Sequence, residues 1–471
     1  MKNIFFNAIL ICFTIASSAQ SKLSLKQAIE TGIANNLTVN QSGLQMQQAG
    51  INLKQSRANM LPNLNAEANN GINQGRSIDP ISNGFVNKQF TYGSYGASSN
   101  VLLFNGFSLQ NKIKGDALSY DATKMELQQA KDNLTINIIL AYLQVLSSQD
   151  ILERAKSQSA VTGKQVERLE VLNKEGAITP AVFYDLKGQL ANDEIAIADS
   201  KAALESAKLS LVQLLNIPYD KNLELERLPE EAFNMDYANT PDKIYQTALS
   251  QFAQIKSVHL RTLSASRNIK SIKGELYPSL FLGASANTNY SSAAMQDYYV
   301  NTTDVQTKSY ILNGTVPQPV FTKQDNYNSR KINFGDQLNN NIFTSVNLGL
   351  TIPIFNGNKV RNRIKLAKLD LKNFEITEQQ TKTALQQSIE RAFVNLTNTS
   401  EKYKILTDQV TSFAESFRGA EIRFNAGAIT SVDYLVAKNN LDRSNSNLIV
   451  SKYDFVLRTK ILDYYEGKPL W

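Results

Sequence analysis

The stretch Gly176-Ala177-Ile178-Thr179 occurs a second time as Gly427-Ala428-Ile429-Thr430, 251 residues further along the chain. Phe104-Asn105-Gly106 recurs at the same offset as Phe355-Asn356-Gly357. Matches separated by a constant offset indicate that one arrangement of elements is used twice. The sequence therefore predicts an internally duplicated protein.

A second set of matches marks the start of each copy. Met60-Leu61-Pro62-Asn63-Leu64 is similar to Leu276-Tyr277-Pro278-Ser279-Leu280, at an offset of 216 residues that also relates Ser24 to Thr240. Ser and Thr favour the N-cap of a helix, and Pro241 suits a first helical position. The difference of 35 residues between the two offsets must lie between Pro278 and Phe355.

These matches predict the division of the chain. It comprises a signal peptide over 1–19, a first repeat over 20–218, a linker over 219–239 and a second repeat over 240–471. Each repeat is expected to hold a helix, a β-hairpin, a long helix and a return helix. In the first repeat the β-hairpin lies at about 62–104, the long helix at 107–172 and the return helix at 181–217. In the second repeat the β-hairpin lies at about 279–355, the long helix at 358–424 and the return helix at 431–466.

The first residues have the pattern of a secretory signal. Lys2 precedes an apolar run over residues 4–16, and Ser17-Ser18-Ala19 supplies small residues before a cleavage site. The apolar run is shorter than the ~20 residues that a spanning helix needs. Cys12, the single cysteine, lies inside this segment, so we expect a mature chain without thiols or disulfides.

Composition excludes most catalytic chemistry. The chain has 471 residues, 19% of them charged, and a net charge of +7 that is dispersed along the sequence. A single histidine, His259, is expected to be a partly buried helix residue rather than a ligand. We therefore expect no enzyme activity, no cofactor, no metal and no nucleic-acid partner.

Four segments alternate apolar and polar residues with period two, and no mature segment is continuously apolar enough for a helical span. The apolar positions are Leu64, Ala66 and Ala68; Ala97, Val101 and Leu103; Leu280, Leu282, Ala284, Ala286 and Tyr290; and Ile342, Val346, Leu348, Leu350 and Ile352. The intervening Asn, Ser, Thr and Gly residues suit a wet lumen. A soluble sandwich with one solvated face is the alternative.

Four strands cannot seal a membrane pore alone. Backbone groups in lipid must all be paired, and small membrane barrels have at least eight strands. We expect three copies to share twelve strands, with two copies and eight strands as the minimum. The segments 70–90 and 291–340 are expected to be surface loops, the second carrying the 35 extra residues.

Two helices are predicted to be far longer than those of compact domains. Residues 107–172 and 358–424 lack proline, and 66 residues of helix extend ~100 Å. The second carries a heptad seam typical of a coiled coil. It comprises Leu385, Ile389, Ala392, Leu396, Thr399, Tyr403, Leu406, Val410, Phe413, Phe417, Ala420 and Phe424. The same positions of the first helix carry a seam diluted with small polar residues.

The combination of four strands, two very long helices and two glycine turns resembles the TolC-type outer-membrane efflux family. The most specific stretch is Arg423-Phe424-Asn425-Ala426-Gly427, followed by Ser431-Val432-Asp433-Tyr434-Leu435. It is similar to the family's Arg-aromatic-x-x-Gly turn and the helix after it. The resemblance covers essentially the whole mature chain.

The resemblance implies a mostly helical fold, in which a homotrimer forms a twelve-stranded transmembrane β-barrel and a coiled-coil tunnel projecting into the periplasm. It further implies a passive exit duct of a tripartite efflux or type I secretion system. The implied partners are outer-membrane lipid, a periplasmic membrane-fusion adaptor and an inner-membrane RND- or ABC-type transporter. The two turns would dock on the adaptor. Their residues are Gly176, Ala177, Ile178, Thr179, Arg423, Gly427, Ala428, Ile429 and Thr430.

The same resemblance identifies an entrance gate. Asp433 matches the first of two aspartates that form charged rings in the family, and Val436 stands where the second would be. Phe424 stands at the position of a gate tyrosine, and Pro180 replaces an acidic partner. We therefore expect a gate held mainly by the packing of Phe417 and Phe424, with Asp433 at the entrance.

Basic and aromatic residues surround the start of the second long helix. We expect Phe104, Phe107, Phe355, Lys359, Arg361 and Arg363 to meet lipid at the membrane interface, with a solvated face as the alternative. No role is assigned to Trp471. The competing function is a soluble periplasmic coiled-coil adaptor or scaffold, which would carry compact β-domains instead of two separated hairpins with wet faces.

Overall fold

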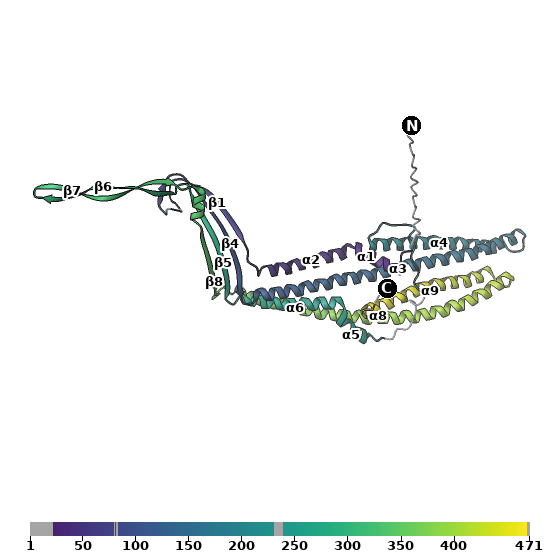
Figure 1. Cartoon of the computed structure of the whole chain (residues 1–471). Helices are drawn as coiled ribbons and strands as arrows, with labels where there is room; N and C mark the ends of the chain where they lie inside the picture. Colours follow the sequence, from purple (N-terminus) through teal and green to yellow (C-terminus); the bar gives the residue numbers. More distant parts are fainter. Residues whose placement is uncertain (1–21, 80, 82, 230–238, 469–471) are drawn as a thin grey trace, which may run out of the picture. The chain divides into compact units, whose positions relative to one another are not determined.

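The computed structural model describes residues 22–79, 81, 83–229 and 239–468 (Figure 1). The predicted signal peptide, most of the second half of the predicted linker, and Trp471 lie outside these residues. The chain forms two compact units. Among the described residues, those within 1–50, 118–263 and 371–471 form the helical unit, and those within 51–117 and 264–370 form the strand unit.

Nine helices are found among the described residues. They are α1 (Leu25–Asn35), α2 (Leu37–Ala58), α3 (Ser108–Lys174), α4 (Pro180–Leu215), α5 (Pro241–Gln251), α6 (Ala253–Gly274), α7 (Phe334–Asn340), α8 (Lys359–Asn425) and α9 (Ser431–Tyr465). Both α3 and α8 have 67 residues, which confirms the two long helices. Their bounds differ by 251 residues, which supports the predicted duplication.

The two predicted N-caps precede helices, with different local chemistry. The Gln27 N–H donates to Ser24 Oγ at 3.2 Å, and the Ser24 N–H donates back to Gln27 Oε1 at 3.1 Å, which is a capping box. Thr240 precedes α5 with Pro241 at the first helical position, but its side chain makes no capping hydrogen bond.

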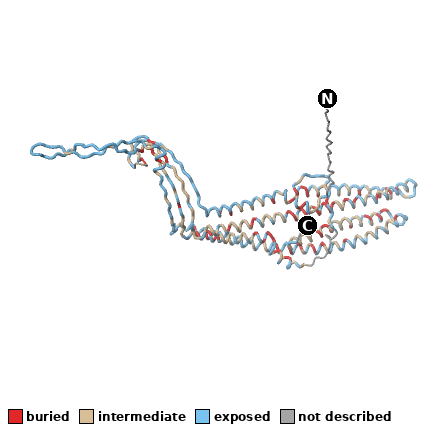
Figure 2. Tube along the Cα trace, viewed as in Figure 1, coloured by how far each residue is buried: buried red, intermediate tan, exposed pale blue. Residues whose placement is uncertain are grey.

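The heptad seam of α8 is confirmed. None of its twelve residues is exposed; Leu385, Leu396 and Phe424 are buried, and Ile389 is fully buried. The corresponding positions of α3 are also buried or half-buried, including the small polar residues Ser148 and Thr162. Figure 2 shows this burial as stripes along the helices. Both seams therefore form the interior of the helical unit, as the period of the sequence predicts.

The largest core of the helical unit includes part of the predicted linker. Leu225 forms a bridge with Leu23 and is 4% exposed. The hydroxyl of Tyr142, which is fully buried on α3, donates to the carbonyl of Leu23 at 2.8 Å. The first residues of the linker are therefore packed against the helices, which a polar composition alone does not predict.

One described helix is apolar enough to suit a membrane. An 18-residue stretch of α3 reaches a mean hydropathy of 1.2, and 56% of it is buried inside the protein. The expectation that composition excludes every helical span was therefore too strong. The buried residues of α3 pack in one cluster with α1, α4 and α9, which is the environment of a core helix.

The strand unit is built around a four-stranded antiparallel sheet. It contains β1 (Asn65–Asn73), β4 (Phe90–Asn105), β5 (Ser279–Ser291) and β8 (Phe343–Thr351), in the order β1-β4-β5-β8. The two predicted hairpins are thus neighbours, joined through the pairing of β4 with β5. β1 and β8 are the edges of this sheet and have a partner on one side only.

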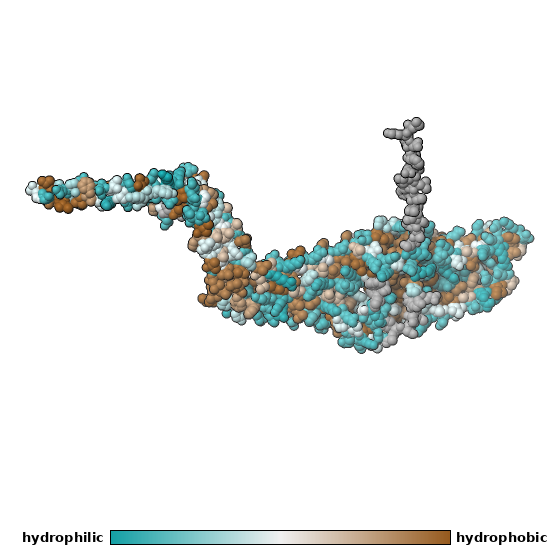
Figure 3. Space-filling model, viewed as in Figure 1, coloured by the Kyte–Doolittle hydropathy of each residue, from teal (hydrophilic) through white to brown (hydrophobic). Residues whose placement is uncertain are grey.

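The two faces of the sheet differ as the alternation predicts. On one face Val101, Leu282 and Leu348 are directly opposite one another, and Leu280 is opposite Leu350. Figure 3 shows apolar residues gathered on the part of the sheet next to the helices. The other face carries polar rows across the strands. One row is Ser98, Ser285 and Ser345, in which the hydroxyls of Ser285 and Ser345 are 2.9 Å apart. A second row is Asn100, Gly283 and Asn347.

The expectation of two surface loops was wrong. The first contains the short strands β2 (Arg76–Ile78) and β3 (Phe85–Asn87), which pair with each other. The second contains a long ribbon of β6 (Met295–Asn313) and β7 (Val316–Lys331), followed by α7. The ribbon projects from the four-stranded sheet (Figure 1). Asn, Ser, Thr and Tyr form strands here because cross-strand pairs of polar side chains also stabilise a ladder.

Candidate functional site

Each helical hairpin of the helical unit ends in the same glycine turn. Gly176 has φ +70° and Gly427 has φ +74°. In both turns the N–H of the following alanine donates to the carbonyl five residues earlier, at 2.8 Å. This is the Schellman arrangement, in which a left-handed residue ends a helix. The repeated sequence thus encodes two equivalent reversals of the chain.

The structure places the nine predicted docking residues together at these turns. Seven of them are exposed: Gly176, Ala177, Thr179, Arg423, Gly427, Ala428 and Thr430. Ile178 and Ile429 are half-buried and pack against an apolar cluster beneath the turns. The turns therefore present polar backbone and small side chains, anchored by one isoleucine each.

The apolar cluster beneath the turns joins the two hairpins. Its buried members are Leu169, Phe183, Leu186, Phe424 and Tyr434, from α3, α4, α8 and α9. The rings of Phe424 and Tyr434 are stacked with centroids 4.7 Å apart, and Phe417 lies 5.5 Å from Tyr434. The two predicted gate phenylalanines are thus brought together, around a tyrosine that the sequence reasoning gave no role.

Tyr434 is fully buried and its hydroxyl has no hydrogen-bond partner among the described residues. Burial raises the pKa of this hydroxyl to about 12, so it stays neutral. An unpaired buried hydroxyl is unfavourable. The ring of Tyr434 is stacked on Phe424, but this contact does not pair the hydroxyl.

Polar contacts also tie the end of α8 to α3. Arg168 Nη2 donates to the carbonyl of Asn425 at 3.0 Å, and Gln165 Nε2 donates to the Asn425 side chain at 2.9 Å. The Asn425 carbonyl belongs to the last turn of α8, where carbonyls lack partners within the helix. These two donors from α3 satisfy groups at that end.

Asp433 is exposed beside the second turn and caps its own helix. The Asp433 N–H donates to Thr430 Oγ1 at 3.2 Å, and the Thr430 hydroxyl donates to Asp433 Oδ2 at 2.8 Å. The hydrogen bond from Thr430 holds the pKa of the Asp433 carboxyl below its usual range. The carboxylate also lies in the first turn of α9, where negative charge is favourable.

A buried ionic cluster lies further along the hairpins. Lys438 on α9 is 2% exposed, and its Nζ is 2.9 Å from Asp193 Oδ2 and 2.7 Å from Asp442 Oδ2. Asp193 on α4 also accepts from Gln189 Nε2 at 2.8 Å and from the Thr162 hydroxyl of α3. Burial raises the pKa of the Asp442 carboxyl. Lys438 therefore connects the second hairpin to the first.

Sequence reasoning missed this cluster, although a signal was present. Lys438 is four residues after the buried Tyr434, and Asp193 is seven residues after the buried Leu186. Both spacings place the charged residue on the buried face of its helix. A lysine and an aspartate on facing buried stripes indicate an ion pair.

The predicted membrane-interface residues lie on the surface of the strand unit. Phe107 is 60% exposed and Phe355 83%, and the Phe104 and Phe107 rings meet edge to face at 5.3 Å. Lys359, Arg361 and Arg363 are exposed in the first turns of α8. Cations are unfavourable at a helix N-terminus, and Glu275 forms an ion pair with Arg363 there.

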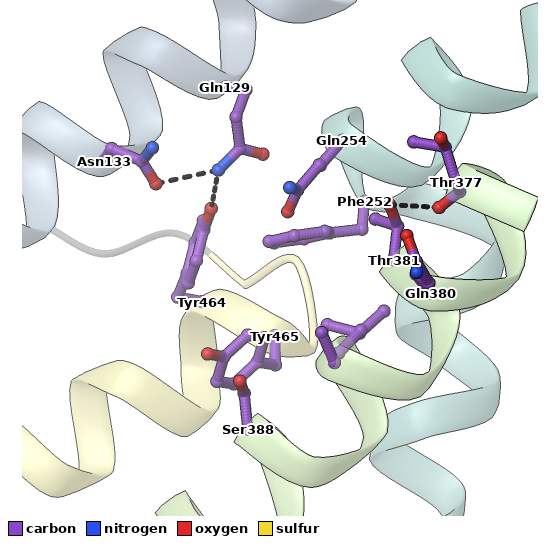
Figure 4. Close-up of a pocket in the computed structure, with 12 residues that line it drawn as sticks. Gln129, Asn133, Phe252, Gln254, Thr377, Gln380, Thr381, Ser388, Tyr464 and Tyr465 are labelled. Carbon is purple, nitrogen blue, oxygen red and sulfur yellow. Dashed lines mark hydrogen bonds between the residues drawn. The ribbon is translucent and has the colours of Figure 1, made fainter. Parts of the chain in front are cut away.

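A cavity of about 360 Å³ lies among α3, α8, α9 and the α5–α6 junction in the helical unit (Figure 4). Phe252 packs against Tyr464 on one side, with ring centroids 5.1 Å apart. Gln129 Nε2 donates to Asn133 Oδ1 at 2.7 Å and to the Tyr464 hydroxyl at 3.2 Å. The cavity is lined by amides, hydroxyls and apolar groups that also pack these helices against one another.

No group of three or more His, Cys, Asp or Glu side chains suited to a metal occurs in the described part of the chain. His259 was expected to be partly buried, but its side chain is 56% exposed. Its Nδ1 lies 3.3 Å from Glu378 Oε1, so the residue takes part in a surface pair between α6 and α8.

The sequence matches a known family over most of its length. Residues 28–216 and 244–459 match the family described as outer membrane efflux protein. The chain is 20% identical over 372 residues to the outer membrane efflux protein BepC of Brucella suis, covering 79% of this chain and 71% of that protein. It is 21% identical over 451 residues to the outer membrane protein TolC of Escherichia coli, covering 94% and 81%.

The fold is similar to that of a solved outer membrane protein. The crystal structure of VceC from Vibrio cholerae superposes with a TM-score of 0.74 at 14% identity, covering 95% of this chain and 97% of that one. The two matched segments of the family begin inside α1 and α5; the first ends at the residue after α4, and the second ends inside α9. Each matched segment lies within one of the two predicted repeats, 20–218 and 240–471.

Proposed function

Because the chain belongs to the outer membrane efflux protein family, we propose that three copies of it share one twelve-stranded barrel and form a passive exit duct. Its place in the outer membrane and its role as an efflux channel follow from the family. The alternative of a soluble periplasmic adaptor is therefore discarded. The number of copies, the closed barrel and the gate are the parts proposed here.

The observation that carries the shared barrel is the open sheet. β1 and β8 each leave one row of backbone N–H and C=O groups without a strand partner. Such edges are not tolerated in the hydrocarbon region of a membrane. Pairing β8 of one copy with β1 of the next would satisfy both edges. Three copies with four strands each give the twelve strands.

Exposed helix faces support the same assembly. On α2, Leu37, Leu44 and Ile51 recur every seven residues and are 64–72% exposed. On α8, the exposed residues Leu366, Leu369 and Ile376 form a second stripe. α2 leads into β1, and β8 leads into α8, so the stripes belong to the helices next to the two open edges. A seven-residue repeat is typical of helices that pack against a partner.

The faces of the sheet suit a water-filled barrel in lipid. Val346, Leu348 and Leu350 are more than 60% exposed on one face, which would contact the acyl chains. The Ser and Asn rows of the other face would line the lumen. Phe104, Phe107 and Phe355 would lie at the membrane interface, with Lys359, Arg361 and Arg363 near anionic head groups.

The proposed partners bind at the two glycine turns. A periplasmic membrane-fusion adaptor would contact the exposed turn residues, and an inner-membrane RND- or ABC-type transporter would supply the energy. The second hairpin is held to the first by the apolar cluster, in which Phe424 and Tyr434 meet Leu169, Phe183 and Leu186, and by the ion pair of Lys438 with Asp193. Opening would separate these contacts, and docking at the turns is the proposed trigger. Asp433 would remain at the entrance as a helix cap with a negative charge.

The shared barrel predicts a trimer in detergent. Native mass measurement of the purified mature protein is expected to give three times the mass of one chain, because each copy leaves two sheet edges unpaired. A variant with proline at Val346 and Leu348 should assemble poorly, since proline removes N–H groups from the edge strand β8. A stable solitary chain in both proteins would contradict the shared barrel.

The gate predicts a closed channel that opens when its packing is removed. In planar bilayers, Phe424→Ala is expected to raise the resting conductance severalfold, because a cavity in place of a buried phenylalanine costs ~3–5 kcal/mol. Asp433→Asn, which keeps the size of the side chain, should change conductance little. A low resting conductance that only Asp433→Asn relieves would show a charged gate instead.

A further inference from the structure

The β6–β7 ribbon has one face that carries four of its five aromatic residues, whereas Tyr298 lies on the other face with Val305 and Ile311. Strand partners lie on the same face, and the pairing places Tyr299 opposite Tyr327, Gln306 opposite Phe321, Tyr310 opposite Pro319 and Leu312 opposite Pro317. Two irregularities in the register keep these pairs on one side. We call this side the aromatic face, defined by Tyr299, Tyr310, Leu312, Phe321 and Tyr327.

Side-chain contacts agree with this assignment. The Tyr299 and Tyr327 rings meet at 6.1 Å, and the Tyr299 hydroxyl lies 2.6 Å from Thr302 Oγ1. On the opposite face Asn326 Nδ2 donates to Asn301 Oδ1 at 3.0 Å and to Thr303 Oγ1 at 2.9 Å. Polar groups are paired across the strands on both faces, since the Thr302 hydroxyl donates to Asp325 Oδ1 at 2.5 Å on the aromatic face.

The aromatic face is uncovered within one chain. Its five defining residues are 57–63% exposed. A two-stranded ribbon is marginally stable in water, and burying such side chains against a partner would stabilise it. Exposed Tyr, Phe and Leu gathered on one side are typical of a protein contact surface.

The base of the ribbon is fixed to the four-stranded sheet. Gln337 of α7 is 1% exposed, and its Nε2 donates to the carbonyls of Ser291 and Ile332 at 3.0 and 2.9 Å. Its Oε1 accepts from the Ser291 N–H at 2.9 Å. Phe334 of α7 packs on Tyr290 of β5 with centroids 4.9 Å apart. The ribbon therefore leaves the sheet from a defined point.

From these observations we infer that the aromatic face packs against the same face of a neighbouring copy of this chain. The inference rests on the proposed shared barrel, which would set the ribbons of all copies around one rim. The face carries both signs of charge, with Asp297, Asp304 and Asp325 beside Lys323 and Lys331, which suits contact between identical surfaces. Pro317 and Pro319 remove N–H groups from β7, so contact through the face is favoured over pairing at that edge.

A crosslinking experiment tests the contact. The mature chain is predicted to lack cysteine, so Phe321→Cys and Thr322→Cys each introduce one thiol, on adjacent residues of opposite faces. With a short bismaleimide on intact outer membranes, Phe321→Cys is expected to give crosslinked dimers. Thr322→Cys should remain monomeric on a denaturing gel. Crosslinks in both variants or in neither would overturn the inference.

Two further measurements separate this inference from the assembly beneath it. Native mass of both variants reports the trimer, so trimers without the Phe321→Cys crosslink would overturn the ribbon contact and leave the shared barrel standing. Amide hydrogen exchange of the unmodified protein avoids any effect of the cysteine on folding. Slow exchange in β6 and β7 is expected, and fast exchange along the whole ribbon would overturn the contact.

Discussion

Replacing Lys438 with alanine is expected to lower the stability of the helical unit by about 3–5 kcal/mol, because Asp193 and Asp442 would be left buried without their cation. Lys438 is 2% exposed and contacts both carboxylates within 3 Å, so water cannot readily replace it. The thermal unfolding midpoint, followed by far-UV circular dichroism of the purified protein in detergent, measures this loss. Lys404→Ala, which removes an exposed lysine from α8, is the matched control.

The same cluster allows a rescue experiment. Replacing Lys438 with methionine and both aspartates with leucine removes all three charges together, and apolar replacement of a buried ion cluster is often neutral or stabilising. We expect this triple variant to regain most of the lost stability. If Lys438→Ala unfolds at the same temperature as Lys404→Ala, Lys438 is not held in a dry, paired environment.

The rescued variant also separates stability from gating. It would keep the two hairpins packed through apolar contacts, with no ion pair between α4 and α9. A triple variant that is stable but conducts more at rest would show that the ion pair contributes to closure. If the triple variant and the unmodified protein have equal resting conductance, the apolar cluster around Phe424 and Tyr434 alone keeps the channel closed.

The long helices and their turns could be predicted because their signals are local and repeated. A strict heptad seam fixes which face of α8 is buried, and a left-handed glycine turn follows from a short motif that occurs twice. The four main strands were predicted because Leu and Val alternate with Ser and Asn over about ten residues. Each of these features depends on neighbours within the same segment.

The missed features depend on partners far away in the sequence. The β6–β7 ribbon was taken for a loop because its ladder is stabilised by pairs such as Asn301 with Asn326, which have no hydrophobic period. Lys438 was passed over because a lysine on a helix is usually solvated, and its burial depends on Asp193, 245 residues away. Asp433 was assigned from resemblance, and its capping bond with Thr430 emerges only from the geometry of the turn.

Gly106→Ala is expected to reduce assembly severely. Gly106 has φ +64°, and a Cβ there would lie 2.4 Å from the carbonyl oxygen of Gly274 and 2.7 Å from the Cβ of Tyr277. We expect a loss of about 4 kcal/mol, combining ~1–2 kcal/mol of backbone strain with ~1–3 kcal/mol of overpacking. The clash involves backbone of α6, which cannot rotate away as a side chain can. The amount of folded oligomer in the outer membrane, measured on a semi-native gel, should fall accordingly.

Gly357→Ala is the matched control, because this glycine occupies the equivalent turn 251 residues later with φ +63°. A Cβ at Gly357 would meet no atom within 4 Å, so only the strain of the left-handed backbone remains, about 1–2 kcal/mol. The difference between the two variants isolates the close approach of the β4–α3 turn to the end of α6. That approach places β4 beside β5 and so joins the two hairpins in one sheet. Equal losses in both variants would mean that the turn conformation alone matters and that the contact with Gly274 does not hold the sheet together.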